Sequence, residues 1–446
     1  MKKAIVIFRQ DLRIDDNTAL IQAIEENDEV FPIFILDKHI IPNFLWLKDK
    51  KFLFVKECLL NLNKELQTLN LKLFVSHWKP EEILRELCSK LNIDTIYGNR
   101  TYGKYGMERD RKISEFCNLK LFKDFLIMDP EEIPRRQILS AYYKLWDKKI
   151  LEQGIHCKTP KTSRLPSCEF SKNLFKTYDI EKYLEERIPG GKHPYFTVEG
   201  IKSRLQTFDF EAYGETRNNP DIDGTSKTSP WVRFGIISPR RLLLSARSSE
   251  DFYRELAFRD FWSHVMYHFP FVKEMEFQPK RRNIPWKYDE KAKEDFFKWC
   301  RGETGYPIVD AAMKQLVEEN WMHGRTRMIV CSFLTKDLLL DWRWGESFFK
   351  QHLLDYDENI NINTWQWGAS VGTDQSPLRI FSPIRQSERF DPQAKYITQY
   401  LPQLKGEDLK AIHNPLEYKL NYIPCIVDHR IAQKETKEVY KKYSTI

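Results

Sequence analysis

The sequence lacks a long apolar segment, paired cysteines and a large excess of one charge. No run approaches the roughly 18 apolar residues of a membrane span, and the apolar start of the chain is too short for a signal peptide. The eight cysteines are scattered and form no C-x-x-C pair, which argues against a disulfide frame or a zinc site. We therefore expect an intracellular, cytoplasmic protein with reduced thiols.

The charge is mildly positive and the aromatic content is high. The chain has 71 basic and 64 acidic residues, a net charge of +7, which permits an anionic partner without requiring one. Its 446 residues are enough for two or three domains. It contains 12 Trp, 20 Tyr and 29 Phe, and nine of the Trp lie at or after Trp231. The second half therefore uses large flat side chains heavily.

Short apolar runs alternate with amphipathic stretches over the first 130 residues. The runs typical of strands are Ala4–Phe8, Val30–Leu36, Leu71–Val75 and Ile93–Tyr97. The stretches typical of helices are Asn17–Glu26 (with Asp16 as a possible cap), Phe52–Leu69 and Pro80–Leu91. This alternation predicts a doubly wound parallel sheet. No G-x-G-x-x-G follows the first run, so the standard dinucleotide-binding fingerprint is absent.

The pattern weakens between residues 131 and 197, where a polar stretch with several prolines predicts a long connection. Beyond it the periodic segments are helical: Arg240–Ala246, Glu255–His268, Asp289–Trp299, Ile308–Glu319, Arg325–Leu340 and Glu346–Leu354. We therefore predict an α/β N-terminal domain over residues 1–130, an inter-domain linker over 131–197 and an all-α C-terminal domain over 198–446.

Two segments carry residues suited to binding a cofactor. Residues 224–229 (GTSKTS) offer hydroxyl and backbone N–H groups and one lysine to a phosphate, although such a loop is also ordinary turn material. The segment Leu353–Trp367 combines Asp355, Asp357, Asn361 and two Trp, and Arg327 is a sensible partner for a carboxylate beside an apolar wall. This segment is consistent with an aromatic cofactor site. It is equally consistent with a helix-end loop whose Trp side chains fill the core.

Other candidate functional residues can also be explained by a purely structural role. Trp286, Trp342 and Trp365 can pass single electrons if the fold brings them into contact, and each taken singly also suits a core position. His323 has no second histidine nearby and is expected to be a structural hydrogen-bonding residue. The basic run 280–282 can meet phosphates or form a solvated face.

Long stretches of the chain resemble the photolyase/cryptochrome family. The segment FRQDLRIDDNTAL (Phe8–Leu20) is similar to the start of that family, and YIPCIVDH (Tyr422–His429) is similar to its end. The flavin-binding half is matched by TGYPIVDAAMKQL (Thr304–Leu316), WMHGRTRMIVCSFLTKDLLLDWR (Trp321–Arg343) and NTWQWGASVGTDQSP (Asn363–Pro377). The resemblance covers the whole chain and is strongest to class I photolyases, which repair cyclobutane pyrimidine dimers.

The resemblance implies an N-terminal α/β domain and an all-helical domain that holds FAD, whose reduced form is active. It places the following residues at the FAD: Tyr213, Thr225, Ser226, Lys227, Thr228, Ser229, Arg259, Trp321, Arg327, Phe349, Asp355, Tyr356, Asp357 and Asn361. Asn361 would face flavin N5, where plant-type cryptochromes usually carry Asp. Trp365, Trp342 and Trp286 match the chain that photoreduces the flavin.

The resemblance also implies DNA that contains a cyclobutane pyrimidine dimer as substrate. The positions that would contact it are Arg217, Glu255, Phe258, Gly324, Arg325, Met328, Trp367 and Gln386. Glu255, Asn361 and the three Trp would carry the catalytic roles, and Glu255 must be protonated to donate to the dimer. Enzymes that repair (6-4) photoproducts carry two His where this chain has Gly324 and Met328, which argues against that activity.

Two positions depart from the photolyase pattern, and the antenna is undetermined. Phe258 stands where Trp is expected and Gly324 where Asn is expected, which can weaken dimer binding or change the substrate preference. Gly106 stands where folate-binding members carry Glu, although Glu108 can substitute. A folate, a deazaflavin, a second flavin or no antenna therefore all remain open.

Three functions are compatible with these motifs. The first is light-driven repair of pyrimidine dimers in DNA by a monomeric enzyme. The second is a cryptochrome-type blue-light photoreceptor that signals through a partner. The sequence ends shortly after His429, without the long extension that signalling cryptochromes often carry, which favours repair. A flavin-binding protein without photochemistry would leave the three matching Trp unexplained.

Overall fold

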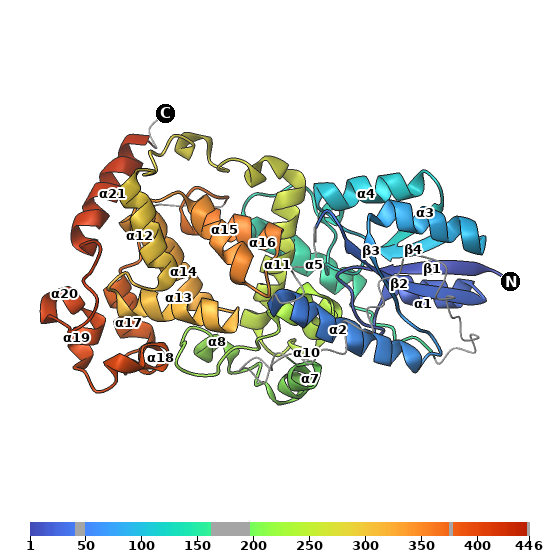
Figure 1. The fold of residues 1–446 in the computed structure, drawn as a ribbon, viewed down its shortest axis with the longest axis horizontal. Helices are drawn as coiled ribbons and strands as arrows, with labels where there is room; N and C mark the ends of the chain where they lie inside the picture. Colours follow the sequence, from blue (N-terminus) through green and yellow to red (C-terminus); the bar gives the residue numbers. More distant parts are fainter. Residues whose placement is uncertain (41–49, 162–196, 374–377, 444–446) are drawn as a thin grey trace. The chain divides into compact units, whose positions relative to one another are not determined.

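The computed structural model describes residues 1–40, 50–161, 197–373 and 378–443 (Figure 1). Contacts divide the chain into two compact units. The first comprises Met1–Ile133, Leu145–Phe208 and Lys227–Arg247, and the second comprises Pro134–Lys144, Asp209–Ser226 and Ser248–Ile446. The units alternate along the sequence, and most of the expected linker lies outside the described residues. The boundaries at residues 130 and 198 stay a prediction.

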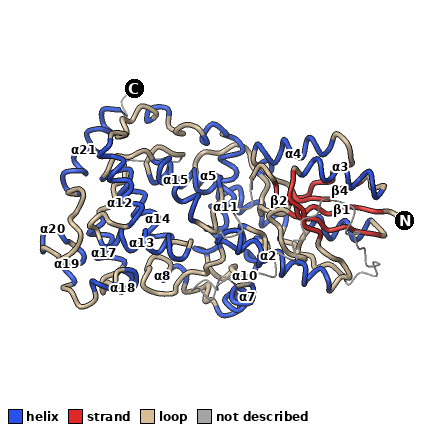
Figure 2. The backbone as a smooth tube through the Cα atoms, in the orientation of Figure 1, coloured by secondary structure: helices blue, strands red, loops and turns tan. Residues whose placement is uncertain are grey.

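The first unit contains a five-stranded parallel sheet, drawn in red in Figure 2. The strand order is β3-β2-β1-β4-β5, so the chain starts in the middle of the sheet and builds outward on both sides. The strands are β1 (Lys3–Phe8), β2 (Glu29–Asp37), β3 (Phe74–Trp78), β4 (Thr95–Asn99) and β5 (Asn118–Phe122). The helices between them are α1 (Thr18–Glu26), α2 (Lys50–Gln67), α3 (Pro80–Leu91) and α4 (Lys104–Ser114). The predicted doubly wound α/β fold is confirmed.

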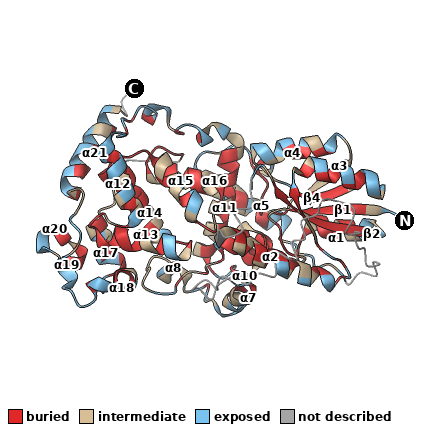
Figure 3. Cartoon of the chain, in the orientation of Figure 1, coloured by how far each residue is buried: buried red, intermediate tan, exposed pale blue. Residues whose placement is uncertain are grey.

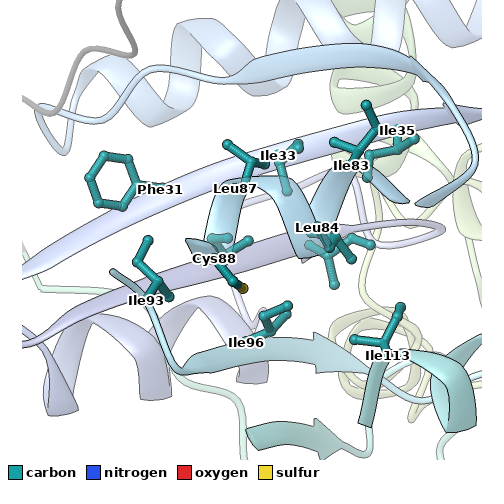
Figure 4. Packing of buried hydrophobic residues seen from close by; sticks show 12 residues of the cluster. Phe31, Ile33, Ile35, Ile83, Leu84, Leu87, Cys88, Ile93, Ile96 and Ile113 are labelled. Atoms are coloured by element: carbon teal, nitrogen blue, oxygen red, sulfur yellow. The ribbon is translucent and has the colours of Figure 1, made fainter. Parts of the chain in front are cut away.

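Alternate residues of the strands form one apolar layer under α3 and α4 (Figure 4). Ile5 and Ile7 of β1 share this layer with Ile33 of β2, because side chains two apart on a strand point to the same face. Leu84 and Leu87 of α3 close the layer and are fully buried. The near-continuous apolar composition of β1 and β2 follows from burial on both faces.

Three details of the predicted elements are wrong. Asn17, rather than Asp16, caps α1, since its side chain accepts the Leu20 N–H at 3.2 Å. The third strand begins at Phe74 rather than Leu71, because its ladder with β2 starts at the pair Ile33↔Phe74. Leu71 and Leu73 are buried outside the strand, and their apolar character made them look like part of it. Helix α4 was not predicted because its sequence is rich in charged and polar residues, and β5 was not predicted because it is short and only partly buried.

The opening motif Phe8–Leu20 builds a buried ion-pair network within the first unit. Arg13 Nη2 donates to Asp124 Oδ1 at 2.7 Å. Arg240, on α10 (Pro239–Ser245), donates to Asp16 Oδ2 at 2.9 Å and to Asp124 Oδ1 at 3.0 Å. These side chains are almost fully enclosed. Two arginines sharing one buried carboxylate explain why α10 belongs to the sheet unit.

The second unit is helical (Figure 2). The helices that form its centre are α11 (Glu250–His268), α12 (Glu290–Arg301), α13 (Pro307–Glu319), α14 (Gly324–Ser332), α15 (Trp342–His352) and α16 (Glu358–Gly368). Helix α16 packs against α11, α14 and α15. Its buried residues are Asn361, Ile362, Asn363, Trp365 and Gln366, and Figure 3 colours buried residues red. The short α8 (Tyr213–Thr216) packs on α11, and α17 (Pro383–Phe390), α18 (Lys395–Tyr400), α19 (Leu409–His413), α20 (Pro415–Tyr418) and α21 (His429–Tyr443) complete the unit.

The predicted helix Arg325–Leu340 is interrupted. Helix α14 ends at Ser332 and is followed by a π-helical turn over Phe333–Asp337, in which every residue is buried. Continuous burial removed the amphipathic signal that would have marked the change. Within the described part of the chain, no helix combines the length and the apolar character that a membrane crossing requires.

Candidate functional site

Helix α16 carries the centre of the candidate site. The Asp357 side chain caps this helix by accepting the backbone N–H groups of Asn359 at 2.9 Å and Ile360 at 3.4 Å. Asn361 and Trp365 are four residues apart and therefore lie on one face of α16. Both are buried. The sequence thus places an amide and an indole side by side in the interior of the helical unit.

Arg327 and Asp355 form the ion pair that the sequence suggested. Arg327 Nη2 lies 2.8 Å from Asp355 Oδ2, and Arg327 Nε donates to the Met322 carbonyl at 2.9 Å. The Asp355 side chain is 5% exposed and that of Arg327 is 29% exposed. A carboxylate this enclosed requires its partner. Arg327 retains solvent-facing surface that a ligand can cover.

Glu346 joins two of the expected flavin residues and was not predicted from the sequence. Asn361 Nδ2 donates to Glu346 Oε1 at 3.1 Å, and the Tyr356 hydroxyl donates to the same oxygen at 3.0 Å. Burial and the Glu346 carboxylate raise the pKa of Tyr356. The Asn361 amide is therefore oriented by a carboxylate on α15. No local motif marks Glu346, because its role depends on how α15 packs on α16.

Trp365 lies in close contact with α15 at Gly345. A Cβ atom built on Gly345 would stand 2.1 Å from Trp365 Cη2 and 2.6 Å from Leu334 Cδ2. The ring of Phe349 meets Trp365 edge to face, with centroids 5.0 Å apart. Gly345 therefore sets the distance between the two helices, and Trp342 lies one turn before it on α15.

Replacing Gly345 with alanine is expected to lower the free energy of unfolding by about 1–3 kcal/mol, because the enclosed Trp365 ring must move. The intrinsic helix preference of alanine acts in the opposite direction and is smaller, at about 1 kcal/mol. Denaturant unfolding measures the free energy of unfolding, and Trp fluorescence reports the movement of the Trp365 ring. Gly324→Ala is the matched control, since nothing lies within 4 Å of its added Cβ. Equal stability of the two variants would contradict the proposed contact.

The other two candidate electron carriers lie in defined positions. Trp342 is 1% exposed, and its Nε1 donates to Glu276 Oε1 at 3.2 Å. Trp286 is 8% exposed and precedes an isolated parallel bridge between Lys287 and Leu340. That bridge brings the Trp286 segment beside the start of α15. Sequential electron transfer through Trp365, Trp342 and Trp286 stays a prediction.

Helix α11 presents the residues expected to meet the substrate. Phe258 and Arg259 lie three and four residues after Glu255, so each of them is a neighbour of Glu255 on the surface of the helix. Arg217 Nη1 donates to Glu255 Oε1 at 2.5 Å. Although 38% of the Glu255 side chain is accessible, the surrounding protein raises the pKa of its carboxyl, and Arg217 opposes this effect. Burial and Glu255 together raise the pKa of the neighbouring Tyr213.

Three of the remaining substrate candidates, Gly324, Arg325 and Met328, lie on α14. Arg325 Nη2 donates to Asn218 Oδ1 at 2.5 Å, and its guanidinium lies 4.2 Å from the centre of the Phe390 ring. Burial lowers the pKa of Arg325, and the nearby Arg389 and Arg217 add to the effect. Arg379 lies 6.0 Å from the Trp367 ring. The guanidinium groups of Arg389 and Arg217 therefore lie near Arg325, in the part of α14 that begins at the exposed Gly324.

The expected phosphate loop crosses from the second unit to the first after Ser226. Gly224 is required where it is, because an added Cβ would stand 2.8 Å from the Thr216 carbonyl oxygen. Ser226 and Thr228 are buried, Thr225 and Lys227 are partly buried, and Ser229 is exposed at the start of α9 (Ser229–Arg233). Lys227 has a φ of 54°, the left-handed region that tight turns use. Joint binding of a phosphate by these residues stays a prediction.

The residues of the helical unit fit a large planar cofactor with polar edges. A side chain at Gly324 would enter open space, and beside it Arg325 Nε is buried with no hydrogen-bond partner among the described residues. The buried Gln386 Oε1 likewise has no hydrogen-bond partner within the described chain. Arg327, Asp357 and Asn361 supply a cation, a carboxylate and an amide. The set suits a flavin ring, and buried Trp321 and Phe349 add apolar surface.

Three other expectations from the sequence can now be compared with the structure. His323 is structural, as expected: it is buried, and its Nδ1 accepts the Arg325 backbone N–H at 3.1 Å at the start of α14. Arg281 is not part of a solvated basic face. Its side chain is buried, donates to the Ser370 carbonyl and lies 5.9 Å from the Tyr440 ring. The seven described cysteines are free, as expected for reduced thiols, and Cys168 lies outside the described residues.

A doubly wound sheet unit and a helical unit with residues suited to a flavin, in one chain, define a class of flavoprotein. Comparison with known proteins identifies this class. Residues 4–165 match the family described as DNA photolyase, and residues 252–442 match the FAD-binding domain of DNA photolyase. The chain belongs to the photolyase/cryptochrome family and carries its FAD-binding domain.

Relatives match over nearly the whole chain. The deoxyribodipyrimidine photo-lyase of Alkalihalophilus pseudofirmus is 33% identical over 98% of this chain and 97% of its own length. An archaeal photolyase from Sulfolobus tokodaii, solved with two FAD molecules, is 30% identical with a TM-score of 0.85, covering 99% of this chain and all of its own. A cryptochrome from Synechocystis is 26% identical with a TM-score of 0.84, covering 98% and 99%. Both branches of the family are therefore similar in fold.

Proposed function

We propose that this protein repairs cyclobutane pyrimidine dimers in DNA with light, using reduced FAD as the electron donor. The placement of Glu255 on α11, beside Phe258 and held by Arg217, is the observation that carries this proposal. A dimer that has accepted an electron is an anion, and a positioned neutral carboxyl can stabilise it by hydrogen bonding. The raised pKa of Glu255 favours that neutral form.

The protein residues would divide the remaining work. Arg327 and Asp355 would hold the polar edge of the flavin, and Asn361 would face it with an amide that cannot supply a proton. When bound, FAD supplies the transferred electron. Trp367, Met328 and Arg325 would contact the dimer, while the neighbouring Arg389 would contact the DNA backbone. A dimer stacks and pairs poorly, which lowers the cost of turning it out of the duplex.

A cryptochrome-type photoreceptor is the alternative. The similarity to the Synechocystis cryptochrome supports it, as do Phe258 and Gly324, which would give the dimer fewer contacts than Trp and Asn. The curated relatives named as photo-lyases support repair, and so does Glu255, which a signalling flavoprotein would not need. We further propose that the protein acts as a monomer in the cytoplasm. Its antenna chromophore is left open.

The proposal is tested with purified protein reduced in advance and mixed with three oligonucleotides. One contains a cyclobutane thymine dimer, one a (6-4) photoproduct and one no damage. We expect blue light to restore thymines in the first only, and no repair in the dark. Failure to repair the cyclobutane dimer in both single-stranded and duplex DNA, with FAD bound, would leave the photoreceptor as the better explanation.

The Phe258→Trp variant is expected to bind dimer-containing duplex DNA about 2–10-fold more tightly, because the larger ring adds about 0.5–1.5 kcal/mol of stacking. Binding isotherms with damaged and undamaged duplexes at one salt concentration measure the change. Phe297→Trp is the matched control, since Phe297 is 57% exposed on α12. Equal affinity of the two variants would show that Phe258 does not contact the dimer.

A further inference from the structure

A row of aromatic side chains connects Trp365 to the protein surface without using Trp342 or Trp286. The Trp299 ring meets Trp365 edge to face with centroids 6.2 Å apart, and it stacks on Phe296 at 5.9 Å. Phe296 contacts Trp344 at 5.2 Å, and Trp344 contacts Tyr288 at 5.8 Å. Each ring in the row therefore touches the next.

Burial decreases along this row. Trp365 is 2% exposed and Trp299 is fully buried. Phe296 and Trp344 are partly buried, and Tyr288 is 52% exposed. The row thus starts in the interior, beside the residues expected at the flavin, and ends where a dissolved reductant can reach a ring. Trp299 and Phe296 lie on α12, and Trp344 lies on α15.

Tyr288 has a proton acceptor at its hydroxyl. The hydroxyl donates to Asp341 Oδ2 at 2.6 Å. The other oxygen of Asp341 accepts the Arg343 backbone N–H at 2.9 Å and faces Arg343 Nη1 at 3.1 Å. Partial burial and Asp341 raise the pKa of Tyr288, so the phenol keeps its proton at rest. Oxidising a phenol releases that proton, and a hydrogen-bonded carboxylate can accept it.

We propose that Trp299, Trp344 and Tyr288 form a second route for electron transfer. During photoreduction of the flavin, it carries an electron from the protein surface to Trp365. The route rests on the proposed light-driven function, with photoexcited oxidised flavin as the oxidant of Trp365. Trp299 returns an electron to oxidised Trp365, and Trp344 returns one to Trp299. Tyr288 returns one to Trp344, and its proton passes to Asp341. A thiol or ascorbate then reduces the tyrosyl radical and resets the phenol.

Phe296 would separate two carriers instead of acting as one. A benzene ring without a heteroatom is much harder to oxidise than an indole, so the electron passes from Trp344 to Trp299 across it. Both indoles are in ring contact with Phe296. The Trp299 indole N–H donates to the Val330 carbonyl at 3.3 Å, which fixes the ring in the row.

The test uses the full chain with oxidised FAD bound, illuminated in the presence of ascorbate. Trp342→Phe blocks the route that the family resemblance implies. We expect this variant to keep photoreducing and to show a tyrosyl radical by electron paramagnetic resonance. Adding Tyr288→Phe or Trp344→Phe should remove the radical and slow photoreduction by about tenfold or more. Tyr418→Phe is the matched control, since Tyr418 is 48% exposed on α20. Adding it should change neither the radical signal nor the rate of photoreduction.

Three results would overturn the inference. One is loss of all photoreduction in the Trp342→Phe variant when its FAD remains bound, and another is an unchanged rate after adding Tyr288→Phe. If Trp342→Phe does not fold, the tyrosyl signal is measured in the otherwise unmodified protein. A tyrosyl signal that persists when Tyr288→Phe is the only change would contradict the route. Dimer repair by chemically reduced protein needs no such route, so it tests the proposed function separately.

Discussion

Replacing Trp365 with phenylalanine is expected to slow light-driven reduction of bound FAD by about 100-fold or more, which corresponds to a barrier about 2.7 kcal/mol higher. The reason is that Trp365 begins both the Trp342 route and the Trp299 route. Phenylalanine keeps an aromatic ring between Gly345 and Phe349, where Trp365 packs, but it cannot be oxidised as easily. FAD content should therefore remain close to that of the unmodified protein.

The measurement is the rate of flavin bleaching under blue light with an external reductant. Trp146→Phe is the matched control, because Trp146 is equally buried and belongs to the sheet unit. An unchanged rate in the Trp365→Phe variant would show that electrons reach the flavin by another path. Loss of FAD from this variant would instead show that Trp365 has a structural role in the site.

Replacing Glu255 with alanine is expected to lower dimer repair per absorbed photon by about 10–100-fold, as the loss of a hydrogen bond to a charged group costs about 1.5–3 kcal/mol. Glu255→Gln retains a neutral donor and should retain most of the repair. Glu250→Gln, exposed on the same helix α11, is the control. Equal repair by the alanine and glutamine variants would contradict a donor role for Glu255.

The same residue predicts how repair depends on pH. Because the pKa of Glu255 is raised, the neutral carboxyl is present below that pKa and is lost as the pH rises through it. Repair should therefore fall toward high pH in the unmodified protein, while the Glu255→Gln variant should show no such fall. Arg217 opposes the raised pKa, so Arg217→Ala should move the fall to higher pH.

Much of the fold follows from periodicity. The sheet was predictable because β1 and β2 are almost wholly apolar and are separated by amphipathic helices. The boundaries in the helical unit were less predictable where burial is continuous, as at the π-helical turn after Ser332. There the sequence carries no contrast between a buried and an exposed face, and only tertiary packing decides the helix end.

The candidate site was predictable where chemistry is local and not where it depends on packing. Asp355, Asp357 and Asn361 lie within one short segment, so their residue types already made a cofactor site one of two explanations of that segment. Glu346 and Glu276 are separated in sequence from the residues they contact, Asn361 and Trp342. The Trp299–Trp344 row was likewise hidden, because spacing in sequence does not reveal ring contacts between α12 and α15.

The central claim is tested most directly by counting thymines restored per photon absorbed. Chemically reduced protein with FAD bound is mixed with an oligonucleotide that contains one cyclobutane thymine dimer, and single flashes are followed by chromatography of the bases. The account predicts thymine formation that follows the number of flashes, stops in the dark and falls in the Glu255→Ala variant. No thymine from single-stranded or duplex substrate, with flavin bound and reduced, would contradict the account.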